Sequence, residues 1–231
     1  MKILALESSA VAASVALIED EKILVENYCN IGFTHSQTLM PMVQNLLSIS
    51  NHSMHEIDGF AVSAGPGSFT GIRIGVSAVK GLAFGTEKPC VPVSTLEGIA
   101  EPFRGQNVTV CAVMDARCKQ FYQAFFSCKG GRIDRLTEDR AVSSEQLTRE
   151  IETMPDPVIL AGDGAYLAYQ LLKNNKCRLA PTQLLFQRAS SVALIGARRF
   201  KEGCFIHAEQ LVPFYLRPPQ AERELAKKKK G

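Results

Sequence analysis

The glycine-rich stretch at residues 63–85, SAGPGSFTGIRIGVSAVKGLAFG, decides the fold of this chain. The apolar residues 59–63 predict a strand that leads into it, and its second part predicts a helix at about 71–85. A second stretch with the same plan, PVILAGDGAYLAYQLL at 157–172, predicts a strand, a Gly-x-Gly turn and a helix. The two stretches indicate one structural pattern that occurs twice in the chain.

The segments around these stretches repeat as well. Each half predicts three strands, a helix, a strand and a helix, and each first strand ends in a carboxylate, Glu7 in LALESS and Asp115 in AVMDAR. This order predicts a duplicated α/β fold of two lobes, with the acidic turns and the Gly-x-Gly turns facing a cleft between them. We place the lobes at 1–104 and 105–220, and expect a disordered basic tail at 221–231. A coincidence of two unrelated α/β lobes is the alternative.

The composition is that of an ordinary globular protein. Of the 231 residues, 46% are hydrophobic and 21% are charged, and the net charge is +3. The lysines at 227–230 contribute to that charge, so no broad basic surface for nucleic acid is indicated, and an RNA contact by the tail is the minor alternative. The apolar run before Glu7 is too short for a signal peptide, and no run of 18 apolar residues predicts a membrane span. We expect a cytoplasmic protein.

The cysteines and histidines do not predict a metal centre. Seven cysteines are scattered without a Cys-x-x-Cys pair, which is typical of buried thiols in a reducing cytosol. His52 and His55 have a spacing that a metal could use, but they lie in a polar stretch that favours a solvated connection.

The loop from Gly65 to Gly71 allows two interpretations. It matches neither of the two common nucleotide-binding patterns, G-x-x-x-x-G-K-[ST] and G-x-G-x-x-G. Its amides, with Ser68 and Thr70, could bind an anion, or the loop could be a tight turn that caps a helix.

Glu7 and Asp115, the two carboxylates that end the first strands, also allow two interpretations. They could hold a metal–phosphate complex across the cleft, or they could cap turns and form ion pairs, as Arg117 beside Asp115 suggests. The residues of this vestigial phosphate or nucleotide cleft would be Glu7, Ser8, Ser9, Gly65, Gly67, Ser68, Thr70 and Asp115.

Two helices stand out as a docking surface. No Asp, Glu, Lys or Arg occurs from residue 27 to 55, and the apolar positions of the helix expected at 36–50 cover about half of its circumference. The glycines of the helix at 71–85 share one face, which suits close approach of another backbone. Burial inside the chain is the alternative, and self-association through these helices is expected when no partner is present. The expected partner-interface residues are Leu39, Met42, Val43, Leu46, Ile72, Val76, Val79 and Lys80.

Several motifs together resemble one family. MKILALESSAVAASVAL, THSQTLMPMVQNLL, GPGSFTGIRIGVSAVKGLAFG, VPVSTLEGIA, MDAR and VPFYLRPPQAE are similar to the TsaB (YeaZ) family from Met1 to about Glu222. The resemblance implies the actin-like fold of acetate kinases, sugar kinases, Hsp70 and actin, with duplicated ribonuclease H-like lobes. It also implies a role in making threonylcarbamoyladenosine at position 37 of tRNAs that read ANN codons.

The resemblance further implies a set of partners. TsaD, of similar fold, transfers the threonylcarbamoyl group from an adenylate that TsaC makes. TsaB is its non-catalytic dimerisation partner through the first two helices, here 36–50 and 71–85. The ATPase TsaE joins them, and tRNA is reached through the complex.

Catalysis by this chain is not implied. The His-x-x-x-His metal motif of TsaD is matched here by Thr95 and Ile99, which cannot replace imidazoles. We expect no tightly bound cofactor, with ATP or ADP at most at a surface shared with partner subunits. The alternative is a nucleotide-binding phosphotransferase or ATPase that works through Glu7, Asp115 and the Gly65–Gly71 loop, whereas a metalloprotease lacks its motif.

Overall fold

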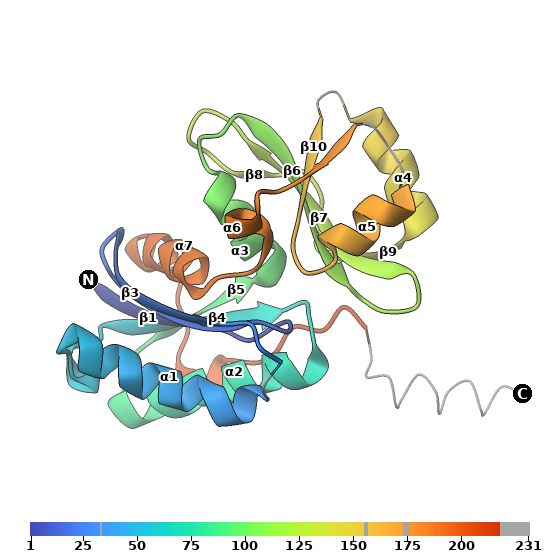
Figure 1. Cartoon of the computed structure of the whole chain (residues 1–231). Coiled ribbons are helices and arrows are strands. Elements are labelled where there is room, and N and C mark those ends of the chain that lie inside the picture. The colour runs from blue at the N-terminus through green and yellow to red at the C-terminus, as the bar shows by residue number, and fades with distance from the viewer. Residues whose placement is uncertain (33, 155–156, 173–175, 218–231) are drawn as a thin grey trace, which may run out of the picture.

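The computed structural model describes residues 1–32, 34–154, 157–172 and 176–217 (Figure 1). Two sheets form two lobes. The first sheet has the strand order β3-β2-β1-β4-β5, in which the first three strands are antiparallel and β4 and β5 run parallel to β1. Its strands are β1 (Lys2–Glu7), β2 (Ala13–Glu19), β3 (Lys22–Cys29), β4 (Gly59–Gly65) and β5 (Cys90–Ser94).

Helices cover both faces of the first sheet. Figure 1 shows α1 (His35–Ser50) and α2 (Phe69–Thr86) on one face and α7 (Ala189–Lys201) on the other. Every residue of β4 is buried, because a parallel strand between two helical layers has no solvent face.

The second sheet has the order β11-β10-β6-β7-β8, and β9 pairs with β7 beside β8. The helices α3 (Thr95–Ala100) and α5 (Ala165–Leu172) contact it, and α4 (Ser144–Thr153) packs on α5, while the short α6 (Thr182–Leu185) precedes α7. Its strands are β6 (Val108–Asp115), β7 (Gln120–Cys128), β8 (Asp134–Arg135), β9 (Arg140–Ser143), β10 (Val158–Ala161) and β11 (Cys177–Leu179).

Each half of the chain lends a helix to the sheet of the other half. Leu96 and Ile99 of α3 belong to the core of the second lobe, and Val192 and Ile195 of α7 belong to the core against the first sheet. The division at residues 104 and 105 therefore needs a correction, because α3 packs on the second lobe and α7 on the first. A break between predicted elements cannot show that two helices are exchanged, since tertiary packing decides which sheet covers each apolar face.

Candidate functional site

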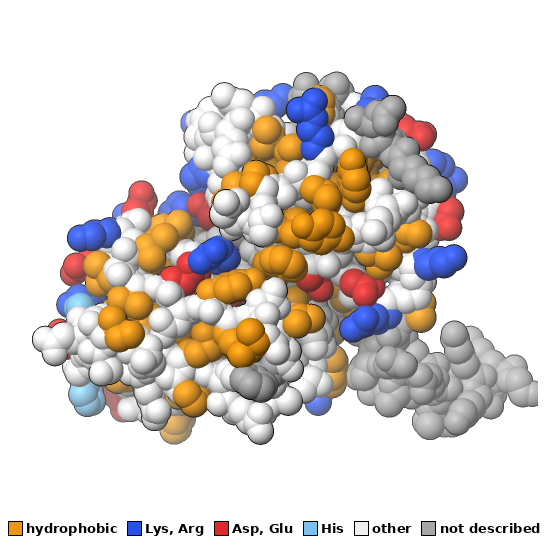
Figure 2. All heavy atoms as spheres, in the orientation of Figure 1, with side chains coloured by type: hydrophobic (Ala, Val, Ile, Leu, Met, Phe, Trp, Pro, Cys, Tyr) orange, Lys and Arg blue, Asp and Glu red, His pale blue; other side chains and the backbone are white. Residues whose placement is uncertain are grey.

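A cleft of about 740 Å³ lies between the lobes. Figure 2 shows acidic and basic side chains where the lobes meet on the face that it presents. Of the residues predicted for a vestigial nucleotide cleft, Ser9, Gly67, Ser68, Thr70 and Asp115 line it. The other three, Glu7, Ser8 and Gly65, are not among its lining residues.

Glu7 lies inside the first lobe with 1% of its surface exposed. The Ser9 amide and hydroxyl donate to its Oε1 at 2.6 and 2.5 Å, and the Ser63 hydroxyl donates to Oε2. Burial raises the pKa of this carboxyl, and the hydrogen bonds from Ser63 and Ser9 oppose that rise. Glu7 is expected to face the cleft, but its carboxylate is turned into the lobe, where Ser9 and Ser63 enclose it, and it is not among the lining residues.

Ser8 joins the turn after β1 to helix α2. Its hydroxyl donates to the carbonyl of Gly71 at 2.9 Å. A Cβ atom at Gly71 would lie 2.1 Å from the Ser8 carbonyl oxygen, and one at Gly75 would lie 2.4 Å from the Ser8 Oγ. These two glycines therefore serve the close approach of the chain's own turn rather than that of a partner.

The segment that contains Phe214 and Tyr215 covers the glycine loop. The amide of Phe214 donates to the Ala64 carbonyl at 2.7 Å, and a Cβ atom at Gly65 would lie 2.1 Å from the Phe214 carbonyl oxygen. Tyr215 stacks on Phe69 with ring centroids 4.6 Å apart. In a phosphate-binding loop this side of Gly65 would be open to the phosphate. Here it is packed against Phe214.

The acidic groups of the second lobe do face the cleft. The amide of Arg117 donates to Asp115 Oδ1 at 2.7 Å, and its guanidinium lies 3.3 Å from Oδ2. Asp163, in the Gly-x-Gly turn, accepts a hydrogen bond from Gln187 at 3.3 Å. Burial, with a smaller contribution from the charge of Asp115, raises the pKa of Asp163 to about 7. The sequence predicts the Gly-x-Gly turn that contains Asp163, but it gives no signal that the Asp163 carboxyl or Arg217 would line the cleft.

The expected docking residues lie mainly inside the first lobe, which corrects the prediction. Met42 is half-buried, and Lys80 donates to the carbonyls of Glu209 and Leu211 at 3.1 and 3.4 Å. The apolar face of α1 is broad because the sheet and α2 cover it, as packing of amphipathic helices requires. The other six side chains are at most 3% exposed: Leu39, Val43, Leu46, Ile72, Val76 and Val79.

The outward face of these helices is apolar at a few points and has little charge. Met40, Ile49 and Phe84 are exposed by 36, 64 and 69%. A Cβ atom at Gly81 or Gly85 would meet nothing within 4 Å, so these two glycines leave bare backbone at the surface. Over α1 the surface in Figure 2 is mainly uncharged. The two helices predicted to dock a partner therefore do have an exposed surface of low charge, but it is formed by other residues than those expected.

Among the described residues there is no group of three or more His, Cys, Asp or Glu side chains that could hold a metal ion. Thr95 and Ile99, the residues expected at the places of the histidine pair, are buried. No described helix is long and apolar enough to cross a membrane. The seven cysteines carry free thiols.

Comparison with known proteins gives consistent similarities. A family model described as TsaD, tRNA N6-adenosine threonylcarbamoyltransferase, matches residues 32–225. The tRNA threonylcarbamoyladenosine biosynthesis protein TsaB of Escherichia coli (strain K12) is 33% identical over 97% of this chain and 98% of its own length. YeaZ from Pseudomonas aeruginosa has a TM-score of 0.80 at 28% identity, with 93% of this chain and 99% of that chain covered.

A more distant structure shows the fold alone. The ethanolamine utilization protein EutJ from Carboxydothermus hydrogenoformans has a TM-score of 0.54 at 10% identity, over 85% of this chain and 90% of its own. The two mixed sheets, each covered by helices, form an actin-like fold of duplicated lobes.

Proposed function

Because the chain belongs to the TsaB (YeaZ) family of tRNA threonylcarbamoyladenosine biosynthesis proteins, we propose that it is the non-catalytic partner of TsaD. In this role it is required for the threonylcarbamoyl group on adenosine 37 of tRNAs that read ANN codons. It scaffolds a complex with TsaD and TsaE in the cytoplasm and reaches tRNA through that complex. When alone, it pairs with itself.

The outward face of α1 and α2 carries this proposal. Interface centres are depleted in charge, and α1 contains no Asp, Glu, Lys or Arg on any side. Ile49 and Phe84 provide large exposed apolar side chains, and Gly81 and Gly85 allow a partner helix to approach the α2 backbone. A face of this kind is stabilised by a partner that covers it.

The family model bears the name of the transferase, yet two features support a non-catalytic role for this chain. By the resemblance to the TsaD motif, Thr95 and Ile99 stand at the places of the metal-binding histidine pair, and both side chains are buried. Glu7, the residue through which a phosphotransferase would act, is sealed by Ser9 and Ser63. We therefore place no reaction in this subunit.

The cleft supports a related proposal about cofactors. With Phe214 packed on Gly65 and Arg117 paired with Asp115, the isolated chain binds no nucleotide tightly. ATP or ADP binds instead at a surface that the subunit shares with its partners. Calorimetric titration of ATP into the isolated chain and into the complex tests this, and micromolar binding by the isolated chain would contradict it.

Light scattering coupled to size-exclusion chromatography tests the docking face. The chain and TsaD from the same cell are expected to elute as a heterodimer, and the chain alone as a homodimer. The variant Ile49→Glu with Phe84→Glu places two charges on the outward face and should abolish both. Charges at buried positions such as Val43 would unfold the lobe and test nothing.

The matched control is Leu136→Glu, which changes a similarly exposed apolar side chain on the second lobe. It should leave both dimers intact. If the folded double variant still binds TsaD as the wild type does, or if the control is equally impaired, the α1–α2 face is not the docking surface.

A further inference from the structure

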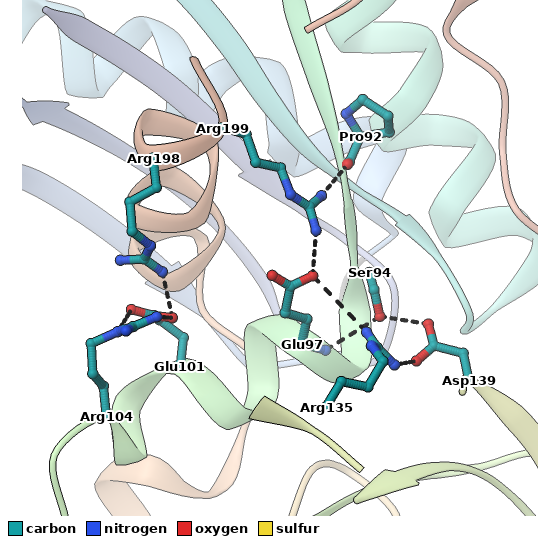
Figure 3. Close-up of polar contacts among 9 residues, drawn as sticks. All are labelled: Pro92, Ser94, Glu97, Glu101, Arg104, Arg135, Asp139, Arg198 and Arg199. Carbon is teal, nitrogen blue, oxygen red and sulfur yellow. Dashed lines mark hydrogen bonds and ion pairs between the residues drawn. The ribbon is translucent and has the colours of Figure 1, made fainter. Parts of the chain in front are cut away.

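The layer between the lobes contains a network of charged side chains, shown in Figure 3. Glu97 and Glu101 project from α3 and the 3₁₀ turn that follows it (Glu101–Phe103). Arg198 and Arg199 reach them from the last turn of α7. These side chains border a small cavity of about 260 Å³, separate from the large cleft. The network is not part of the proposed docking face.

The bonds of Glu97 cross from one lobe to the other. Its carboxylate lies 2.5 Å from Arg199 of α7 and 4.0 Å from Arg135 of β8. Arg199 also donates to the carbonyl of Pro92 in β5, at 2.8 Å. Arg135 pairs with Asp139, which accepts a hydrogen bond from Ser94 at 2.5 Å. The end of β5 in the first lobe is thus bonded directly to the second lobe.

Glu101 makes a parallel connection and is more deeply buried, with 4% of its side chain exposed. Arg198 of α7 lies 2.5 Å from it, and Arg104 donates to both carboxylate oxygens at 3.0 and 3.1 Å. Arg104 continues to the carbonyl of Gly131 in the second lobe, at 2.9 Å.

Because α3 packs on the second lobe and α7 on the first, the ion pairs between these two helices also join the two lobes. The apolar face of α3 lies in the core of the second lobe, while its acidic face is bonded to α7, which lies on the first sheet. Closure of two lobes by shear needs packed helices to slide past each other. Sliding of α3 along α7 would break the Glu97–Arg199 and Glu101–Arg198 pairs, and the buried Glu101 carboxylate would then keep only Arg104.

We propose that this network is an interlobe clamp that holds the large cleft at one fixed opening. The two lobes then move as one body, and a cleft of the actin-like type does not open and close in this chain. The clamp consists of Glu97, Glu101, Arg135, Arg198 and Arg199, and it acts through bonds between lobes rather than through a ligand.

Distances between spin labels across the cleft test the clamp. Val11, in the lining of the first lobe, is changed to cysteine, and the native Cys118 of the second lobe takes the other label. Cys29→Ser and Cys204→Ser remove the other accessible thiols, while the remaining cysteines are buried. The labelled parent chain should give one narrow distance distribution.

The variant Glu97→Gln with Glu101→Gln should make that distribution about twofold wider and shift it to longer distances, since the sliding helices are freed. Glu202→Gln is the matched control, because Glu202 borders the same cavity outside the described ion pairs. If the double variant does not fold, Arg199→Gln alone removes the Glu97 ion pair from the α7 side and should widen the distribution in the same direction. A broad distribution in the parent chain, or an unchanged narrow one in a folded variant, overturns the clamp.

Discussion

The turns that follow β1 and β6 occupy equivalent places in the two lobes but differ in what surrounds them. After β1, the carboxylate of Glu7 is buried and accepts hydrogen bonds from Ser9 and Ser63. After β6, Asp115 is partly exposed and pairs with Arg117, whose side chain is 78% exposed. Glu7 therefore forms hydrogen bonds inside its lobe, whereas Asp115 faces the cleft.

The backbone shows the same contrast. The first turn is packed on α2, and Gly71 and Gly75 make room for Ser8. In the second turn Arg117, Cys118 and Lys119 all have positive φ angles, between 55 and 64°, a region that side chains other than glycine adopt at a cost. Duplication therefore preserved the order of elements while the two turns took different roles, one structural and one exposed at the cleft.

Of the substitutions that test this difference between the two turns, Glu7→Ala should lower the stability of the chain most. It removes a buried side chain and leaves the Ser9 amide and the Ser9 and Ser63 hydroxyls without their acceptor, which should lower the free energy of unfolding by about 3 to 4 kcal/mol. Urea unfolding followed by circular dichroism measures it. The control Asp115→Ala should cost about 0.5 kcal/mol, because an exposed ion pair contributes little. Equal losses would show that both carboxylates have one role.

Gly71→Ala tests whether the first turn is packed on α2 as closely as the distances indicate. The new Cβ would lie 2.1 Å from a backbone oxygen, so the helix or the turn must shift, at about 2 to 3 kcal/mol. Gly81→Ala, on the outward face of the same helix, meets nothing and should stabilise the chain by up to about 1 kcal/mol. Thermal unfolding of both variants compares them, and a gain at Gly71 would contradict the close packing.

The pH dependence of stability tests the state of Asp163, which lines the cleft in the second lobe. The pKa of Asp163 is raised in the folded state from 3.8 to about 7, so the folded chain holds a proton that the unfolded chain releases. Its contribution is full below about pH 4 and is lost as the pH rises through 7, which amounts to about 3 kcal/mol between pH 5 and pH 8. Asp163→Asn should remove this slope. An unchanged slope in urea titrations across that range would show that the group titrates normally.

Cys118→Gly should give the smallest effect, a gain of about 1 kcal/mol, because glycine adopts the positive φ of this turn without steric cost. Cys118→Ala keeps the Cβ atom and should give no gain. A differential scanning calorimetry series of the two variants separates backbone relief from loss of the thiol. A similar gain in both would assign the effect to the thiol instead.

Local and repeated features of the chain could be predicted from the sequence. The order of strands and helices, the duplication and the absence of charge from residue 27 to 55 depend on residue types along the chain. The place of the cleft between the lobes follows from the duplication.

The tertiary structure alone decided which face of each helix is buried and which carboxylate is sealed. Glu7 is enclosed by Ser63, 56 residues away, and Gly65 is covered by Phe214 from the far end of the chain. Val43 and Val76 look like interface anchors in the sequence because an apolar face reads the same whether a sheet or a partner covers it. Burial depends on contacts between distant segments, and periodicity along one segment carries no record of them.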